Sequence, residues 1–535
     1  MKNKLLNIVA VVSMLFATQA SFGTNPSLGI AGDFVLFTTD GGLTNVGHTL
    51  LTGNVGTNNG AIGGFGNVNG GMHNADGVTA SAATDLLTAY NLLNSATPTL
   101  FPAPLLGNGQ KLTPGIYYIS ESASLTNKLY LDGEGNANAE FIIQINGAFS
   151  TAALSEVVLL NNAKACNVFW KVEGLIDMSS GTVMKGNLIA NNGAIVMNAG
   201  VQLEGRALST TGAITTNGIS AFTPVGCGSE VLNGPLAPNL SETSCYALFT
   251  ANGGLTNSGI SFVTGDIGTN AGLTTGFQEL NVTGLIHPLP DASTAAVAAD
   301  LVNVYTYLNN LTHDIQLLYP AQFGNDLELT PHTYLLNAAT VLTDTVYLNA
   351  LGNADAIFVI KITGALSTST YAKVLLTNGA QAKNVYWKVS GAVEINEYSE
   401  FKGVIVANNG AINIKTGTVL LGRALSTSGA LTTEASTITM QSPCVNPITA
   451  IVQPTSDKLA TISTNNSGNE LEIQLMGNSN QYDAQFYVYD TTGRLLMSKA
   501  ITESTTMIQS NFPTGIYVYK LLSGERSQKG KFIVQ

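Results

Sequence analysis

The side chains that most often carry enzyme chemistry are few in this sequence, and their spacing suits neither catalysis nor metal binding. Five histidines occur, which are His48, His73, His287, His313 and His332. None lies in an HExxH zinc motif, and the sequence has no GxSxG, no phosphate-binding glycine loop and no calcium-binding nonapeptide repeat. We therefore expect no catalytic residue, no metal site and no cofactor, and we predict that the protein is not an enzyme.

An internal repeat shows which of the remaining residues recur. NVFWKVEG at 167–174 returns as NVYWKVSG at 384–391, and GRALSTTGAITT at 205–216 returns as GRALSTSGALTT at 422–433, both at an offset of 217 residues. Near the start, FTTDGGLTN returns as FTANGGLTN at an offset of 212 residues. The chain therefore contains two homologous units, at about 28–228 and 244–445.

Few candidate chemical groups persist in both units. Among the histidines only His73 and His287 correspond, and an aspartate follows each of them. A metal site is one interpretation, but we expect a contact at the entry of a helix. Arg206 and Arg423 recur in GRALS, and we expect each to bind backbone carbonyls rather than to act in catalysis.

The four cysteines would be disulfide candidates in an oxidising compartment. They are Cys166, Cys227, Cys245 and Cys444, and their spacing does not resemble a zinc site. Bridges within each unit, Cys166–Cys227 and Cys245–Cys444, are our first prediction among three connectivities. A Cys227–Cys245 bridge between the units is the alternative.

The N-terminus is typical of a signal peptide. Lys2 and Lys4 precede an apolar run at 5–17 that is too short to span a bilayer, and Thr18-Gln19-Ala20 offers a cleavage site. The protein should be secreted or lie on the outer cell surface. The net charge of −12 and the lack of a basic run exclude a nucleic-acid partner, and we expect no membrane insertion of the mature domains.

Short β-branched stretches punctuated by Gly, Asn and Ser predict strands throughout both units. Regular strand-and-turn spacing in the second half of each unit suits the stacked coils of a β-solenoid. Helical spacing occurs once per unit, at 82–93 and 297–308. Each unit should therefore have one amphipathic helix of about 15–20 residues along an apolar flank.

The order of these features resembles the ice-binding-like domain family. FTTDGGLTN, GNVGTN, LTPGIYYI, LYLDGEGNANAEFIIQI, ACNVFW and GRALST carry the resemblance. It implies a mainly β fold with two tandem discontinuous right-handed β-solenoids, each with one long flanking α-helix. It also implies adsorption to ice through a flat solenoid face rich in Thr and small residues.

Such a face needs side chains that order water without holding hydration shells of their own. Thr combines a methyl and a hydroxyl on a stiff β-branched side chain with little rotamer freedom to lose. The predicted outward residues are Thr57, Asn58, Thr126, Thr151, Ser179, Thr182, Asn198, Thr215, Thr216, Thr269, Asn270, Thr343, Thr345, Thr368, Thr370, Asn396, Thr416, Thr418, Thr432 and Thr433. Because Lys415 stands where unit 1 has Asn198, we predict that unit 1 has the cleaner face.

The last 80 residues or so resemble the C-terminal sorting domain of Bacteroidetes-type secretion, through VYD, TGRL, PTGIY and KFIV. This resemblance implies a small C-terminal β-sandwich and passage across the outer membrane. The predicted organisation is a signal peptide at 1–23, solenoids at 24–228 and 244–445, linkers at 229–243 and 446–456, and a sorting domain at 457–535.

Two functions remain open from the sequence. The first is a secreted ice-binding protein that inhibits ice growth or recrystallisation or attaches cells to ice. The second is a surface adhesin or polysaccharide-binding module on the same fold without ice activity. The expected partner is the ice crystal surface, with cell-surface polysaccharide as a further partner through processing of the tail.

Overall fold

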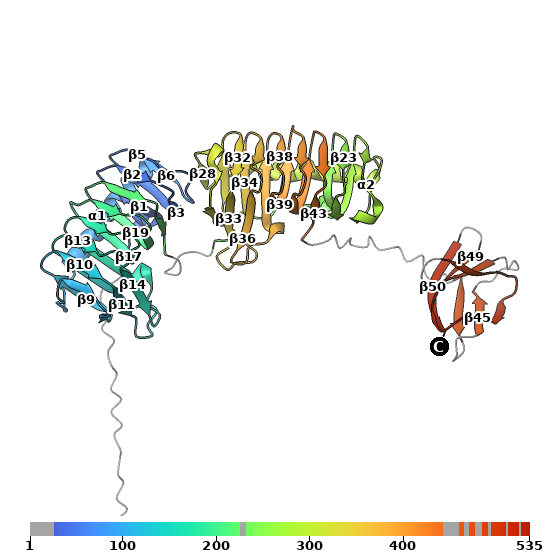
Figure 1. Ribbon diagram of the computed structural model, residues 1–535, viewed down its shortest axis with the longest axis horizontal. Coiled ribbons are helices and arrows are strands. Elements are labelled where there is room, and N and C mark those ends of the chain that lie inside the picture. The colour runs from blue at the N-terminus through green and yellow to red at the C-terminus, as the bar shows by residue number, and fades with distance from the viewer. Residues whose placement is uncertain are drawn as a thin grey trace, which may run out of the picture. The chain divides into compact units, whose positions relative to one another are not determined.

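The computed structural model describes residues 26–224, 232–441, 459–464, 470–476, 484–490, 494–509, 512–523 and 526–534. The chain forms two compact units that divide between Cys444 and Val445. The first unit contains two solenoids, which we call solenoid 1 (residues 29–222) and solenoid 2 (residues 241–439) (Figure 1). The second unit is a small C-terminal module. The predicted signal peptide and the linker at 446–456 lie outside the described residues.

Solenoid 1 consists of two parallel sheets and one long helix. Its eight-stranded sheet contains, in spatial order, β5 (Ile62–Gly63), β2 (Leu43–Val46), β20 (Ile214–Asn217), β18 (Ile195–Met197), β16 (Ile176–Met178), β13 (Phe149–Thr151), β10 (Ala123–Thr126) and β7 (Leu105–Gly107). Its 13-stranded sheet contains β6 (Met72–Asn74), β4 (Asn54–Thr57), β1 (Phe34–Thr38), β19 (Gln202–Ser209), β17 (Val183–Ala190), β14 (Glu156–Leu160), β11 (Lys128–Asp132), β8 (Lys111–Leu112), β12 (Phe141–Ile145), β15 (Val168–Val172), β9 (Gly115–Ile119), β21 (Ser220–Phe222) and β3 (Leu50–Thr52). The helical segments are η1 (Gly29–Asp33), α1 (Gly77–Ser95) and η2 (Ala165–Asn167).

Solenoid 2 repeats this plan. Its eight-stranded sheet contains β26 (Thr274–Thr275), β23 (Leu255–Ser258), β42 (Leu431–Glu434), β40 (Ile412–Ile414), β38 (Val393–Ile395), β35 (Leu366–Thr368), β32 (Thr340–Thr343) and β29 (Phe323–Gly324). Its 14-stranded sheet contains β27 (Val282–Thr283), β24 (Phe262–Thr264), β43 (Thr437–Thr439), β41 (Val419–Ser426), β39 (Glu400–Ala407), β37 (Val385–Val389), β34 (Phe358–Ile362), β31 (Thr333–Leu336), β28 (Ile315–Leu317), β22 (Tyr246–Thr250), β25 (Asp266–Thr269), β30 (Leu327–Leu329), β33 (Thr345–Asn349) and β36 (Lys373–Thr377). The helical segments are η3 (Ser241–Cys245), η4 (Glu279–Asn281), α2 (Ala292–Asn310), η5 (Pro320–Gln322) and η6 (Ala382–Asn384).

Alternation along each strand builds the core. In β20, for example, Ile214 and Thr216 point inward while Thr215 and Asn217 point outward. Because successive side chains of a strand face opposite sides, such a strand contributes every second residue to the core, whereas a strand beneath the helix, such as β15, is buried on both sides. Stacked coils then join these residues into one continuous apolar core in each solenoid. The predicted fold of two tandem solenoids is confirmed.

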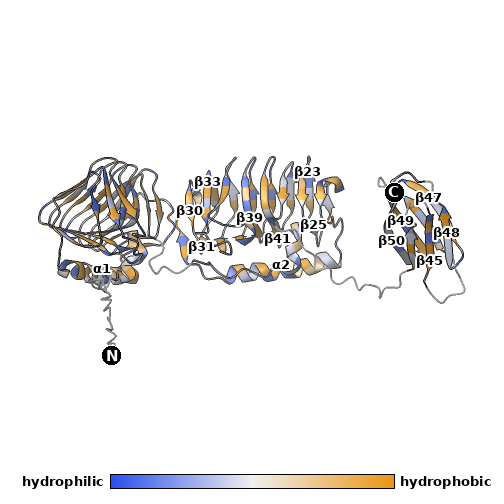
Figure 2. Ribbon diagram, turned by 90° about the horizontal axis from the view of Figure 1, so that it is seen from below, coloured by the Kyte–Doolittle hydropathy of each residue, from blue (hydrophilic) through white to orange (hydrophobic). Residues whose placement is uncertain are grey.

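A 19-residue helix covers one side of each solenoid, as the spacing predicted (Figure 2). Both helices begin with a capping box, in which Asp76 and Thr79 bind each other's backbone N–H in α1, and Asp291 and Thr294 do so in α2. The buried positions of α1 are Thr79, Ala82, Leu86, Ala89 and Leu93. No helix in the described part of the chain is long and apolar enough to cross a membrane.

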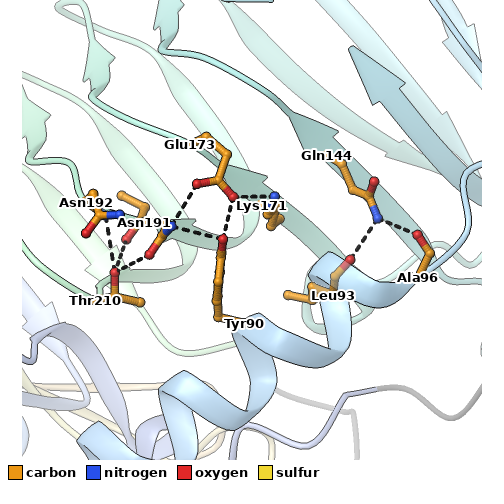
Figure 3. A network of polar contacts seen from close by, with 10 residues as sticks. Tyr90, Leu93, Ala96, Gln144, Lys171, Glu173, Asn191, Asn192 and Thr210 are labelled. Carbon is orange, nitrogen blue, oxygen red and sulfur yellow. Dashed lines mark hydrogen bonds and ion pairs between the residues drawn. The ribbon is translucent and has the colours of Figure 1, made fainter. Parts of the chain in front are cut away.

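Polar contacts fix α1 on the sheet beneath it (Figure 3). The Tyr90 hydroxyl donates to Glu173 at 2.5 Å, and the amide of Asn191 donates to the other oxygen of Glu173 at 2.7 Å. Lys171 forms an ion pair with the same carboxylate. At the end of the helix, Gln144 Nε2 donates to the carbonyl of Leu93 at 2.7 Å. Solenoid 2 has Ser390 in place of Glu173, so this ionic network belongs to solenoid 1 alone.

The C-terminal module contains two antiparallel sheets. One has β44 (Ala460–Thr464), β45 (Glu470–Leu475) and β48 (Thr505–Gln509), and the other has β47 (Leu495–Ile501), β46 (Ala484–Tyr489), β49 (Gly515–Ser523) and β50 (Arg526–Val534). A core of its own, which includes Leu471, Phe486, Val488 and Leu521, lies between them. This arrangement is the predicted small β-sandwich.

Both cysteines among the described residues, Cys166 and Cys245, are disulfide-bonded. Cys227 and Cys444 lie outside the described residues, so the pairing within each unit stays a prediction. The boundaries of the domains also stay predictions.

We predict that Glu173→Gln loosens α1 in a pH-dependent way. Burial alone would raise the pKa of the Glu173 carboxyl, but the hydrogen bonds that it accepts outweigh burial and lower the pKa below its ordinary value. A lowered folded-state pKa gives stability that is present above the ordinary value of 4.5 and is lost as the pH falls through the folded-state pKa. At neutral pH the variant should lose about 1.5–3 kcal/mol of unfolding free energy, as for hydrogen bonds to charged groups. In acid, the unfolding free energies of the protein and the variant should converge.

Amide hydrogen exchange of α1, measured over a pH series, checks this prediction. Glu156→Gln is the matched control, because Glu156 pairs with Lys128 at 2.7 Å on a strand away from α1. That half-exposed pair should contribute less than about 1 kcal/mol and should leave exchange in α1 unchanged. Equal exchange of α1 in the protein and in Glu173→Gln at neutral pH would contradict the prediction.

Candidate functional site

In the eight-stranded sheet of solenoid 1, one outward position of every strand belongs to an unbroken row. Pairing in register places Thr44 beside Thr215, Thr215 beside Val196, and Val196 beside Asp177. We call this row face 1. Its members, from β5 to β7, are Gly63, Thr44, Thr215, Val196, Asp177, Ser150, Ser124 and Leu105. Because neighbouring strands lie about 4.7–4.9 Å apart, the side chains of the row repeat at a regular spacing.

Face 1 contains small hydroxyl and apolar side chains and a single charged group. That group is the carboxylate of Asp177, to which Asn198 Nδ2 donates at 3.1 Å. The ion pairs of solenoid 1 gather on the other sheet, where Lys185 binds Glu204 at 2.8 Å and Lys128 binds Glu156 at 2.7 Å. The fold therefore separates a nearly uncharged face from a charged one.

Solenoid 2 presents an equivalent row, which we call face 2. Its members, from β26 to β32, are Thr275, Thr256, Thr432, Asn413, Glu394, Ser367 and Val341. Glu394 stands at the position of Asp177, so each face has one carboxylate at the same place. Asn413 replaces Val196, which makes face 2 more polar.

The border of face 2 differs more than its centre. Lys415 binds Glu434 at 3.3 Å, where solenoid 1 has Asn198 and Asn217. The exposed rings of Tyr371 and Tyr398 stack at the turns that follow β35 and β38, with centroids 5.1 Å apart. Solenoid 2 therefore has both charge and bulk beside its face.

Nine of the predicted outward residues are buried and cannot contact an external surface. They are Thr57, Thr151, Thr182, Thr216, Thr269, Thr345, Thr368, Thr418 and Thr433. Many of their hydroxyls have partners inside the protein. Thr57 donates to the carbonyl of Gly41 at 2.7 Å, and Thr216 donates to Asn45 at 2.7 Å. These assignments were wrong because a buried Thr also satisfies turn carbonyls, which residue type alone does not show.

The other predicted residues lie on the faces or near their edges. Thr215 and Thr432 are members of face 1 and face 2. Thr126 and Thr343 end strands β10 and β32, each of which lies next to the outermost strand of its sheet. The remaining ones occupy turns that leave the strands, and they are Asn58, Ser179, Asn198, Asn270, Thr370, Asn396 and Thr416.

Several members of the faces were not predicted from the sequence, among them Thr44, Ser124, Ser150 and Thr256. The pattern that identifies them is alternation with a large apolar neighbour. In β13, Phe149 points inward and Thr151 is buried, so Ser150 must point outward. The position in the strand, rather than the residue type, was the informative feature.

The other candidate groups have structural partners. His73 Nδ1 lies 2.8 Å from Asp76, and His287 Nδ1 lies 2.6 Å from Asp291, so each histidine contacts the capping residue of a helix. Arg206 Nε donates to the carbonyl of Gly32 at 2.7 Å. Within the described ranges, no cluster of three or more His, Cys, Asp or Glu side chains could hold a metal ion.

Comparison with known proteins agrees with this architecture. The ice-binding-like family model matches residues 37–220 and 249–439, and the model of a secretion system C-terminal sorting domain matches residues 460–535. A solved ice-binding protein from an Antarctic bacterium of the Flavobacteriaceae is 60% identical, with a TM-score of 0.77, over 79% of this chain and 100% of that chain.

Curated relatives match over shorter stretches. An ice-binding protein of Nostoc is 38% identical over 35% of this chain and 69% of its own length. Ice-binding protein 1 of Shewanella frigidimarina is 29% identical over 42% of this chain, but the match spans only 28% of that protein. Because the family model covers more than half of the sequence, the chain belongs to the ice-binding-like family, in two tandem copies followed by a secretion sorting domain.

Proposed function

We propose that the protein adsorbs to ice through face 1, with a weaker contribution from face 2, and that it catalyses no reaction. One observation carries the proposal, namely that the outward row of eight consecutive strands contains a single charged side chain. The named ice-binding relatives support it, because the Antarctic protein aligns with 79% of this chain and the Nostoc protein with 35%.

Flatness and rigidity suit adsorption to a crystal. Ice offers no pocket and no charge, so the protein must match a plane with many weak contacts. The residues of face 1 have short side chains, which lose little rotamer entropy when they are fixed against a surface. Parallel pairing on both sides fixes the backbone of Thr215 between β2 and β18.

Charge opposes such adsorption. A carboxylate or ammonium group holds its own hydration shell, and its removal from water costs several kcal/mol in protein interiors. Face 2 borders on Lys415 and Glu434, whereas face 1 has asparagines at these positions. We therefore infer that solenoid 1 provides most of the affinity.

The sorting domain directs the protein to the cell exterior, where ice forms. We propose that the mature protein either is released or stays attached to the cell surface, with cell-surface polysaccharide as the partner in the attached form. Released protein would shape ice or inhibit recrystallisation. Attached protein would hold cells in contact with ice.

We predict that Thr215→Tyr weakens adsorption to ice. A tyrosine ring within face 1 would keep neighbouring residues from the ice plane. The fraction of protein that enters a slowly growing ice hemisphere should fall about tenfold, which corresponds to about 1.4 kcal/mol. Ser220→Tyr is the control, because Ser220 is exposed on β21 of the other sheet, and it should partition as the unchanged protein does.

Thr432→Tyr tests which of the two faces contributes more to adsorption. It should reduce partitioning less than Thr215→Tyr does. Loss of partitioning in Thr432→Tyr together with an unaffected Thr215→Tyr would overturn the assignment to solenoid 1. Failure of the unchanged protein to enter ice would overturn the proposed function itself.

We predict that Asp177→Asn strengthens adsorption. The amide has nearly the shape of the carboxylate but lacks its charge, and no ion pair would be lost, because Asp177 receives its hydrogen bond from the neutral Asn198. A gain of about 1 kcal/mol in the free energy of adsorption would lower the protein concentration that stops recrystallisation by about fivefold. Glu204→Gln, on the charged sheet, should leave that concentration unchanged. A higher concentration for Asp177→Asn would show that the carboxylate contributes to binding.

A second candidate function is adhesion through polysaccharide binding, which the exposed pair of Tyr371 and Tyr398 favours. Stacked aromatic side chains are enriched at binding surfaces. One face of the Tyr398 ring, however, covers the backbone of Gly417. Alanine at both tyrosines should abolish retention on a polysaccharide matrix if this candidate is correct, and should leave ice partitioning unchanged.

A further inference from the structure

Each solenoid has two ends, and in the described part of the chain only one end of each is covered by the other solenoid. We name the ends by the outermost strand of the eight-stranded sheet. Solenoid 1 has a β7 end and a β5 end, and solenoid 2 has a β29 end and a β26 end. Hydrogen bonds join the β5 end of solenoid 1 to the β29 end of solenoid 2. The β7 end and the β26 end have no such partner among the described residues.

The internal junction is a specific polar interface. The Asn67 amide donates to the carbonyl of Tyr319 at 2.8 Å, and it accepts from the Tyr319 N–H at 2.9 Å. Asn69 donates to Thr330 at 3.0 Å and accepts from the Tyr334 hydroxyl at 2.7 Å. Asn69 is only 3% exposed, so separation of the ends would break buried hydrogen bonds at a high cost.

The free β7 end has the same threonine and tyrosine that bind Asn69 at the β29 end. Thr113 and Tyr117 stand where solenoid 2 has Thr330 and Tyr334. The Tyr117 hydroxyl oxygen lies 2.5 Å from the carbonyl oxygen of Thr113, and the Tyr334 hydroxyl oxygen lies 2.7 Å from that of Thr330. Asn108 also shares its left-handed backbone (φ 53°) with Asn325 (φ 51°), whose carbonyl binds the first solenoid at the junction.

At the internal junction, solenoid 1 inserts two asparagines into solenoid 2. The free β26 end has one of these two side-chain types at the equivalent positions. The backbone N–H of Gly265 binds the carbonyl of Thr283, as that of Gly53 binds Asn69, both at 2.9 Å. Thr283 is therefore the counterpart of Asn69, and Asn281 that of Asn67. A hydroxyl and an amide thus stand where the junction uses two amides.

Both free ends are also apolar. At the β26 end, Leu280 is 98% exposed, and Leu273, Leu285 and Leu289 are more than half exposed. At the β7 end, Phe101 is 70% exposed, and Leu105 is 53% exposed. Solenoids normally end in polar caps that keep them soluble. Exposed apolar patches of this kind mark interaction surfaces.

We propose that the β26 end of one chain binds the β7 end of a second copy, in the same orientation as the internal junction. The internal junction shows that such ends fit, and the leucines would contact Phe101 and Leu105 of the second chain. The contact is heterologous, because two different surfaces meet, so each added chain leaves one β26 end and one β7 end free. The product is an open row of chains that lengthens with concentration. Such a row would also multiply the number of faces available to one crystal.

Mass measurement by sedimentation velocity over a concentration series tests this proposal. As the concentration rises, the measured mass of the unchanged full chain should increase from that of one chain to that of two or more chains. Leu280→Asp should remain at one chain, and so should Phe101→Asp. Leu154→Asp is the control, because Leu154 is 78% exposed in a turn away from both ends. That variant should associate as the unchanged protein does.

A mixture of the two end variants gives the sharpest result. Leu280→Asp keeps an intact β7 end, and Phe101→Asp keeps an intact β26 end. The mixture should therefore form two-chain particles and nothing larger, although neither variant associates alone. Association of Phe101→Asp alone would show a symmetric contact between β26 ends and would overturn the proposal. A constant mass of one chain for the unchanged protein would overturn it as well, and would leave a different protein as the occupant of the β26 end.

Discussion

The glycine turns of successive coils lie directly on one another, and the rest of the solenoid depends on this contact. A Cβ atom on Gly193 would lie 2.1 Å from the carbonyl of Gly174, and one on Gly212 would lie 2.5 Å from Gly193. No other residue fits at such a distance. The buried hydroxyl of Ser209 then donates to the carbonyl of Gly193 at 2.9 Å, so the stacked turns keep their hydrogen bonds without water.

This stacking determines both the register and the flatness of the faces. Once each turn is fixed on its neighbour, the strand that follows must start in register with the equivalent strand of the neighbouring coil. Residue pairs such as Val196 and Thr215 therefore lie side by side. A slip by one residue would turn the whole apolar set outward, so the core reinforces the register. The helix adds rigidity on another side, where Tyr90 and Asn191 bind Glu173.

Much of the fold was predictable, whereas the site was predictable only in outline. The repeat, the helices and the strands follow from spacing that the sequence displays directly. The outward residues do not, because Thr serves two purposes in this fold. Thr215 and Thr216 are adjacent and identical, yet the first faces solvent and the second binds Asn45 in the interior. They differ only in their distance along the strand from the buried Ile214, and that alternation depends on where the preceding turn ends.

Comparison of the two solenoids shows which features the fold itself demands. Inward positions keep their character, as where Ile195 corresponds to Ile412. Outward positions at the edge vary freely, so that Gly181 becomes Tyr398 and Asn198 becomes Lys415. Solenoid 2 folds in the same way with this charge and bulk beside its face. The low charge around face 1 is therefore not a requirement of folding, and it agrees with the proposed contact of this face with ice.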